Sequence, residues 1–138
     1  MRQLLFVLFL ALISSKIYSQ IPSWENTKDW KLYDINRPDQ FNISVDSLVH
    51  FRHVLLNSDS MINFVKSVSI ISDLRRPVWM GFYVISYTIE NGAIEKIEAG
   101  QYGGYFYDEK TKKYYELPLE IRKDWLNYLS KKGELLNN

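Results

Sequence analysis

The chain of 138 residues contains no cysteine. This absence excludes cysteine nucleophiles, thiolate zinc sites, iron–sulfur clusters and a lipid-modified N-terminal cysteine. It also excludes disulfides, so an exported form of this chain must be stabilised by its hydrophobic core alone. A single domain of this length is large enough to bury such a core.

An excess of charge of one sign is also missing. The chain has 17 lysines and arginines against 16 aspartates and glutamates, and the basic residues form no stripe. A nucleic-acid-binding protein would be expected to carry a clear basic excess, so we expect no nucleic-acid partner. The sequence also contains no internal repeat, no low-complexity tract and no sign of a second domain.

Long hydrophobic runs are absent apart from residues 4–13. As a helix this run would reach about 15 Å, roughly half of the hydrocarbon core of a bilayer, so a membrane span is not expected. Arg2 precedes the run, and small and polar residues follow it up to Ser19. A charged start, an apolar middle and a small residue at the cleavage point predict a secretory signal peptide over residues 1–19.

The predicted organisation follows from that cleavage point. We expect a flexible leader over residues 20–29, one globular domain over 30–133 and a frayed tail over 134–138. Export without disulfides suits a bacterial periplasm or the outside of a bacterial cell.

The sequence of the first part of the domain predicts one strand and two helices. Aromatic residues before a turn favour a strand over residues 30–35. Ser44 is a suitable N-cap for a helix reaching about Arg52, with Asp46 in its first turn. Asn57 or Ser58 caps a second helix, and its apolar stripe has helical spacing: Met61, Phe64, Val65 and Val68.

A run of strands follows. Residues 78–90 are apolar on both faces and predict a central strand that is covered on both sides. Asn91-Gly92 predicts a tight hairpin that returns over residues 93–101. Because Ile94 and Ile97 have opposite parity, we expect a bulge or an early bend between them.

A second hairpin is predicted from residues 105–108 and 113–116. Its symmetric register places Tyr107 opposite Tyr114 and Phe106 opposite Tyr115. The same register places Asp108 opposite Lys113, an opposite-charge pair that favours it.

The chain ends in a helix that can begin at Pro118. Its apolar stripe is Ile121, Trp125, Tyr128 and Leu129, and Gly133 is its expected C-cap. The order of elements predicts an α+β fold. We expect an antiparallel sheet of about four to five strands, a meander of hairpins, with two helices before it and one C-terminal helix packed on one face.

Asp46, His50 and His53 form the one constellation with metal-ligand chemistry. On a helix these positions fall within about 60° of one another, so they could hold zinc and leave one coordination position open. The alternative is a solvated helix face, because the apolar residues of this segment point the opposite way. No other feature implies a cofactor.

Seven tyrosines gather in the predicted sheet. Tyrosine supplies flat apolar area with one hydroxyl and suits recognition of a protein or a glycan. The alternative is that tyrosine simply has high β-propensity. We expect Trp79 and Phe106 in the core. The predicted binding residues are Tyr83, Tyr87, Tyr105, Tyr107 and Tyr114.

Catalytic motifs are missing. Gly103-Gly104 lacks the following Lys-Ser/Thr of a phosphate loop, and no Gly-x-Ser-x-Gly accompanies the two histidines. Paired carboxylates remain an option for acid–base chemistry. The candidates lie on predicted strands, with lysines available as partners: Glu90, Glu95, Glu98 and Glu116.

These observations favour an exported binding protein that contacts a protein or glycan through an aromatic sheet face. An inhibitor or immunity-type protein is one form this could take. The alternative is a small periplasmic hydrolase that uses carboxylates or the Asp46/His50/His53 group.

Overall fold

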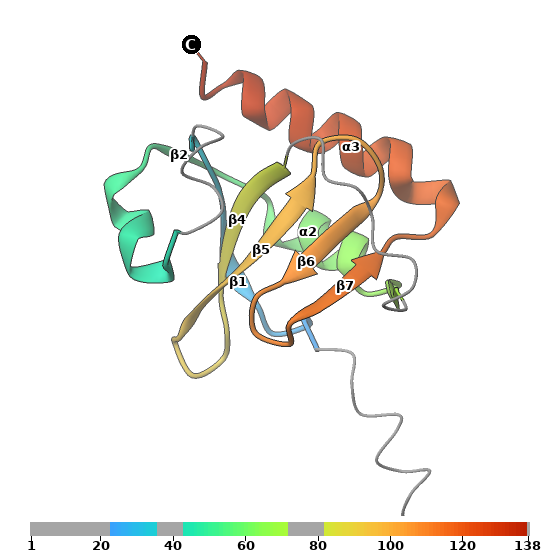
Figure 1. Ribbon diagram of the computed structural model, residues 1–138, viewed down its shortest axis with the longest axis horizontal. Coiled ribbons are helices and arrows are strands. Elements are labelled where there is room, and N and C mark those ends of the chain that lie inside the picture. The colour runs from blue at the N-terminus through green and yellow to red at the C-terminus, as the bar shows by residue number, and fades with distance from the viewer. Residues whose placement is uncertain (1–22, 36–42, 72–81, 138) are drawn as a thin grey trace, which may run out of the picture.

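The fold is a seven-stranded antiparallel sheet with helices, an α+β architecture (Figure 1). A computed structural model describes residues 23–35, 43–71 and 82–137. The strand order is β2-β1-β4-β5-β6-β7-β3. The strands are β1 (Lys28–Tyr33), β2 (His53–Leu55), β3 (Ser69–Ile70), β4 (Phe82–Thr88), β5 (Ile94–Gly100), β6 (Tyr105–Asp108) and β7 (Lys113–Glu116). The helices are the 3-10 helix η2 (Val45–His50) and the α-helices α2 (Ser58–Val65) and α3 (Leu119–Glu134).

The predicted fold class is confirmed, but the sheet is larger than predicted. The additional strands β2 and β3 contain three and two residues and form the two edges of the sheet. Segments this short show no alternating pattern in the sequence. They are strands only because each pairs with a strand distant in the sequence, β1 and β7 respectively.

The helix predicted from Ser44 to about Arg52 is shorter and of another type. Ser44 is the N-cap, as expected, and its hydroxyl accepts a hydrogen bond from the Ser47 N–H. The 3-10 helix ends at His50, because Phe51 already has extended backbone angles. The chain then continues into β2, which pairs with β1.

The sheet carries a core on each of its faces. On one face α2 and α3 pack against a large core that includes Ile85 and Trp125. On the other face η2 contributes Leu48 to a smaller core that includes Val84. Val84 and Ile85 are neighbours on β4 and are both fully buried. The prediction that this strand is covered on both sides is therefore confirmed for β4, whereas residues 78–81 and Trp79 lie outside the described residues.

Two hairpins build the centre of the sheet (Figure 1). β4 and β5 pair without interruption from Thr88↔Ile94 to Phe82↔Gly100, so the predicted bulge is absent. No bulge is needed to bury Ile94, because this residue lies half-exposed at the sheet margin. The next residue on the same face of β5 is Lys96, which is buried. The β6–β7 register is the predicted one, residue for residue.

The packed domain extends beyond both predicted ends. Trp24 is 3% exposed and packs edge-on against Phe106, and β1 begins at Lys28, so residues 23–29 are not a free leader. At the other end α3 runs to Glu134, and Leu136 is buried. Gly133 is therefore a helical residue and not the C-cap; a Cβ there would lie 3.3 Å from the Tyr83 ring.

Residues 1–22, which include the predicted signal peptide, lie outside the described residues. Within the described part of the chain, none of the helices combines the length and the apolar character that crossing a bilayer requires.

Candidate binding surface

The sheet register divides the five predicted tyrosines between the two faces. Tyr83 and Tyr87 lie on the face covered by α2 and α3, because they share the parity of Ile85. The other three lie on the opposite face of β6 and β7: Tyr105, Tyr107 and Tyr114. Parity along each strand thus separates surface tyrosines from tyrosines that face the helices.

Tyr87 is a core residue, which corrects its assignment to a binding surface. Its ring stacks on Trp30 with centroids 4.6 Å apart, and its hydroxyl donates to the buried Asp108 carboxylate at 3.4 Å. Burial, followed by the nearby Asp108 charge, raises the pKa of the Tyr87 hydroxyl above its ordinary value. A surface partner cannot reach this side chain, because only about 2% of Tyr87 is exposed.

Tyr105, Tyr107 and Tyr114 form what we call the tyrosine face. All three are partly exposed. Tyr107 and Tyr114 are directly opposite each other across the hairpin, with ring centroids 4.9 Å apart and planes inclined by 47°. The Tyr105 ring lies 5.2 Å from the Arg122 guanidinium, a cation–π contact at the end of the strand.

A half-buried carboxylate adjoins this face. Glu98 pairs with Tyr107 in the β5–β6 register, and the Nζ of Lys96 lies 3.4 Å from its carboxylate. Lys96 is itself buried and donates to the carbonyl of Ile43 at 2.7 Å. Burial raises the pKa of Glu98, and the Lys96 charge opposes that shift. A lysine beside a strand glutamate agrees with the sequence-based expectation, but the burial of Lys96 becomes apparent only in the sheet.

Other strand glutamates also lie beside basic groups. The Glu95 carboxylate is 3.3 Å from the Nζ of Lys110, and the Glu116 carboxylate is 3.2 Å from the Arg122 guanidinium. These two carboxylates are therefore engaged in ion pairs with basic side chains.

The helical face that motivated a metal site does not exist. His53 lies on β2, beyond the end of η2, and its ring tilts against Tyr33 with centroids 5.5 Å apart. Asp46 and His53 line one groove of about 590 Å³, and His50 and His53 line a neighbouring groove of about 540 Å³, so Asp46 and His50 do not share a groove. Across the described ranges, no three histidine, aspartate or glutamate side chains gather closely enough to hold a metal ion.

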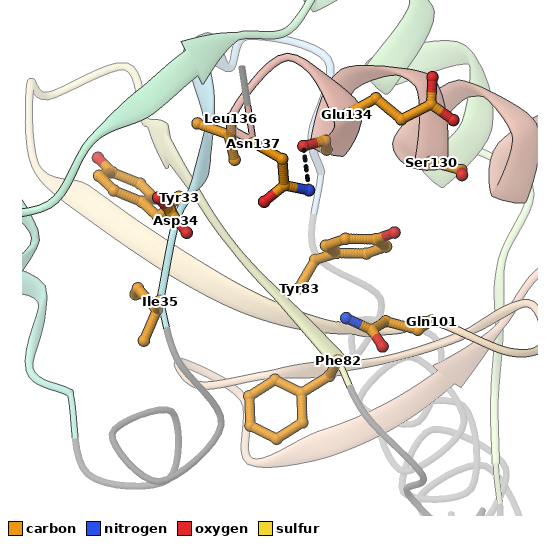
Figure 2. Close-up of a pocket in the computed structure, with 11 residues that line it drawn as sticks. Tyr33, Asp34, Ile35, Phe82, Tyr83, Gln101, Ser130, Glu134, Leu136 and Asn137 are labelled. Atoms are coloured by element: carbon orange, nitrogen blue, oxygen red, sulfur yellow. Dashed lines mark hydrogen bonds between the residues drawn. The ribbon is translucent and has the colours of Figure 1, made fainter.

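A polar pocket of about 350 Å³ lies where β1 ends, β4 begins and α3 ends (Figure 2). The Tyr83 side chain extends into it, between Gln101 and the last turn of α3 (Figure 2). Burial, then the nearby Tyr102 and Glu134, raises the pKa of Tyr83. The pocket is lined by polar groups that could hydrogen-bond a small polar molecule. These groups belong to Asp34, Tyr83, Gln101, Ser130, Glu134 and Asn137.

Sequence reasoning found Tyr83 but missed this pocket. Its lining residues come from positions as far apart as Asp34 and Asn137, and no local spacing connects them. The Asp34 carboxylate is already engaged by the Arg52 guanidinium at 3.1 Å.

The described residues thus present a tyrosine face, a polar pocket and two grooves beside β2. No protein-family model, curated protein or solved structure matches this chain.

Proposed function

We propose that this protein is an exported binding protein whose tyrosine face contacts a protein partner. One observation carries the proposal: Tyr107 and Tyr114 lie side by side, partly exposed, on the sheet face opposite α2 and α3. Tyrosine loses little conformational freedom on binding and offers both apolar area and a hydroxyl, so such a pair is a suitable centre for an interface.

The ring geometry favours a protein over a glycan as the partner. A sugar ring stacks best on a flat aromatic surface, but the Tyr107 and Tyr114 planes are inclined by 47°. Two inclined rings make a wedge, which suits an inserted protein side chain.

Charged groups of both signs surround the wedge. The Nζ of Lys112 lies 2.6 Å from the Glu109 carboxylate in the turn of the same hairpin, and that contact lowers the pKa of Glu109. Glu98 adds a half-buried carboxylate on the β5 side. A polar rim around an aromatic centre is the usual arrangement of a protein interface.

Export is supported by the charged, then apolar, then small-residue pattern of residues 1–19. N-terminal sequencing of protein from the native host should start close to Gln20. Recovery of Met1 on a cytosolic product would contradict export but would leave the tyrosine face untouched.

Site-specific cross-linking tests the binding surface. A photoreactive phenylalanine analogue replaces Tyr107 in one variant and Tyr102 in the control; Tyr102 is 69% exposed and lies outside the tyrosine face. We expect one defined protein to cross-link from position 107 and not from position 102. The double variant Tyr107→Ser/Tyr114→Ser should then bind the purified partner at least about tenfold more weakly, while Tyr102→Ser binds normally.

Equal cross-linking from both positions, or normal binding by the folded double variant, would disprove the proposal. Retention on a glycan array that depends on Tyr107 would show that the partner is a glycan instead. Far-ultraviolet circular dichroism and thermal melting of each variant establish that it is folded.

A further inference from the structure

Among the described residues, β2 pairs with another strand on one side only, that of β1. In the pairing with β1, the Arg52 carbonyl accepts from the Asp34 N–H at 2.9 Å, and the Leu56 N–H donates to the Trp30 carbonyl at 2.8 Å. Backbone groups alternate in direction along an antiparallel strand. The N–H and C=O groups of His53 and Leu55 therefore point away from β1, toward the open edge of the sheet.

A groove lies on each side of this edge, and His53 lines both. On the α3 side the groove measures about 540 Å³, and on the η2 side about 590 Å³. Side chains of a strand added to β2 would point alternately to these two sides. The edge thus supplies hydrogen-bonding groups, and the grooves supply room for alternate side chains.

The two grooves differ in chemistry. The α3-side groove is lined by Arg52, His50 and His53 together with apolar residues. One nitrogen of the Arg52 guanidinium contacts the Asp34 carboxylate at 3.1 Å, but this side chain is 64% exposed and a guanidinium carries further N–H donors. The η2-side groove is lined by aliphatic residues that include Leu48, Val49 and Ile94, and it also contains Lys31 and Asp46, one charge of each sign. Val49 is 80% exposed, and the neighbouring Leu55 is 65% exposed. An added strand should therefore carry carboxylates on one side and aliphatic side chains on the other.

We propose that the β2 edge binds an extended acidic peptide segment of another protein as an added strand. The peptide's backbone pairs with His53 and Leu55, its carboxylates face Arg52, and its aliphatic side chains enter the η2-side groove. This is strand addition, in which main-chain hydrogen bonds provide affinity and side-chain grooves provide selectivity. The surface is separate from the tyrosine face, because β2 and the β6–β7 hairpin are at different ends of the sheet order.

The test uses protein produced from the full 138-residue coding sequence and a capped heptapeptide of alternating valine and glutamate. Two-dimensional amide NMR should show the largest shifts at His53 and Leu55, with slower hydrogen exchange at both amides. A heptapeptide of the same composition without the alternation is the first control and should bind at least about tenfold more weakly, because it cannot satisfy both grooves.

Methylation of peptide nitrogens separates pairing from simple charge attraction. Methyl groups on the nitrogens that face β2 should weaken binding about tenfold, whereas methyl groups on the alternate nitrogens should not. In the protein, Arg52→Gln should weaken binding several-fold, while Lys112→Gln on the β6–β7 turn should have no effect.

Three results would overturn the proposal: no shift at His53 and Leu55, equal binding of the non-alternating peptide, or indifference to which nitrogens are methylated. None of these depends on the tyrosine face, so failure here and failure of the proposed function are distinguishable.

Discussion

Buried polar residues show how the tertiary environment changes what a side chain does. The register places Asp108 opposite Lys113, as the sequence predicts. The Asp108 carboxylate is nevertheless fully buried and accepts hydrogen bonds from the N–H and the hydroxyl of Thr111, at 3.2 and 2.7 Å. Its main contribution is to hold the turn of the hairpin, since a buried carboxylate needs such donors.

Gly104 illustrates the same dependence on distant residues. Nothing local demands a glycine, but a Cβ at this position would overlap the Cγ of Arg122 and lie 2.8 Å from its Cδ. The Arg122 side chain is held in place because its Nε donates to the Leu117 carbonyl at 2.8 Å and its guanidinium contacts Glu116 at 3.2 Å.

We predict that Gly104→Ala lowers the free energy of unfolding by about 1–2 kcal/mol, because it displaces Arg122 from these hydrogen bonds. In an Arg122→Ala background, Gly104→Ala should leave the free energy of unfolding almost unchanged. Urea denaturation of the four proteins in this double-mutant cycle measures the coupling.

Gly92→Ala provides the control for that cycle. Gly92 has φ +85° with open space around it, so alanine there should cost about 1 kcal/mol from backbone strain whether or not Arg122 is present. Equal costs of Gly104→Ala in both backgrounds would show that Arg122 is not the reason for the glycine.

At the level of elements, those with local signals were predicted and those without were not. α2 has an N-cap and an apolar stripe at the expected positions, and α3 buries Trp125 and Leu129 as predicted. The 3-10 helix η2 was predicted as a longer α-helix. An N-cap residue such as Ser44 indicates where a helix begins, but not whether it is an α-helix or a 3-10 helix.

The α2 cap yields a prediction at this scale. The Asn57 side chain accepts from the Ser60 N–H at 2.8 Å, so Asn57→Ala should destabilise the protein by about 1 kcal/mol. Asn57→Asp keeps an acceptor and should cost only a few tenths of that amount. Thermal melts of both variants check the difference; an alanine variant as stable as the parent would mean that α2 is held by tertiary packing alone.

At the scale of the whole molecule, one core joins both ends of the described chain. Trp24 and Trp125 belong to the same buried cluster, together with residues of α2 and of the central strands. Trp125 packs edge-on against Phe64 of α2, with ring centroids 5.3 Å apart. The sheet, α2 and α3 should therefore unfold together.

Trp125→Ala tests this shared core. We expect the free energy of unfolding to fall by about 3–5 kcal/mol. Circular dichroism and tryptophan fluorescence should report the same unfolding transition. Trp125→Phe should cost much less, because the indole N–H is buried without a hydrogen-bond partner among the described residues. Separate transitions for the two probes would show that α3 folds independently of the sheet.

Local patterns were sufficient for the α+β class, the two α-helices and both central hairpins. Turn residues such as Asn91-Gly92 and the alternation along β6 and β7 act over a few residues, so they are readable before any tertiary contact is known. The alternation along β6, together with the predicted pairing of Tyr107 with Tyr114, implies that Tyr105, Tyr107 and Tyr114 share one face, as the structure has them.

Long-range pairing was needed for the rest. β2 and β3 have too few residues to show a period, and they are strands because Tyr33 pairs with His53 and Tyr115 with Ile70. That pairing removed His53 from the helix of Asp46 and His50. Stacking on Trp30 covers Tyr87, and the end of α3 brings Tyr83 to a pocket with Asp34 and Asn137. Contacts between residues so far apart follow from closing long loops over a shared core, which no short stretch of sequence encodes.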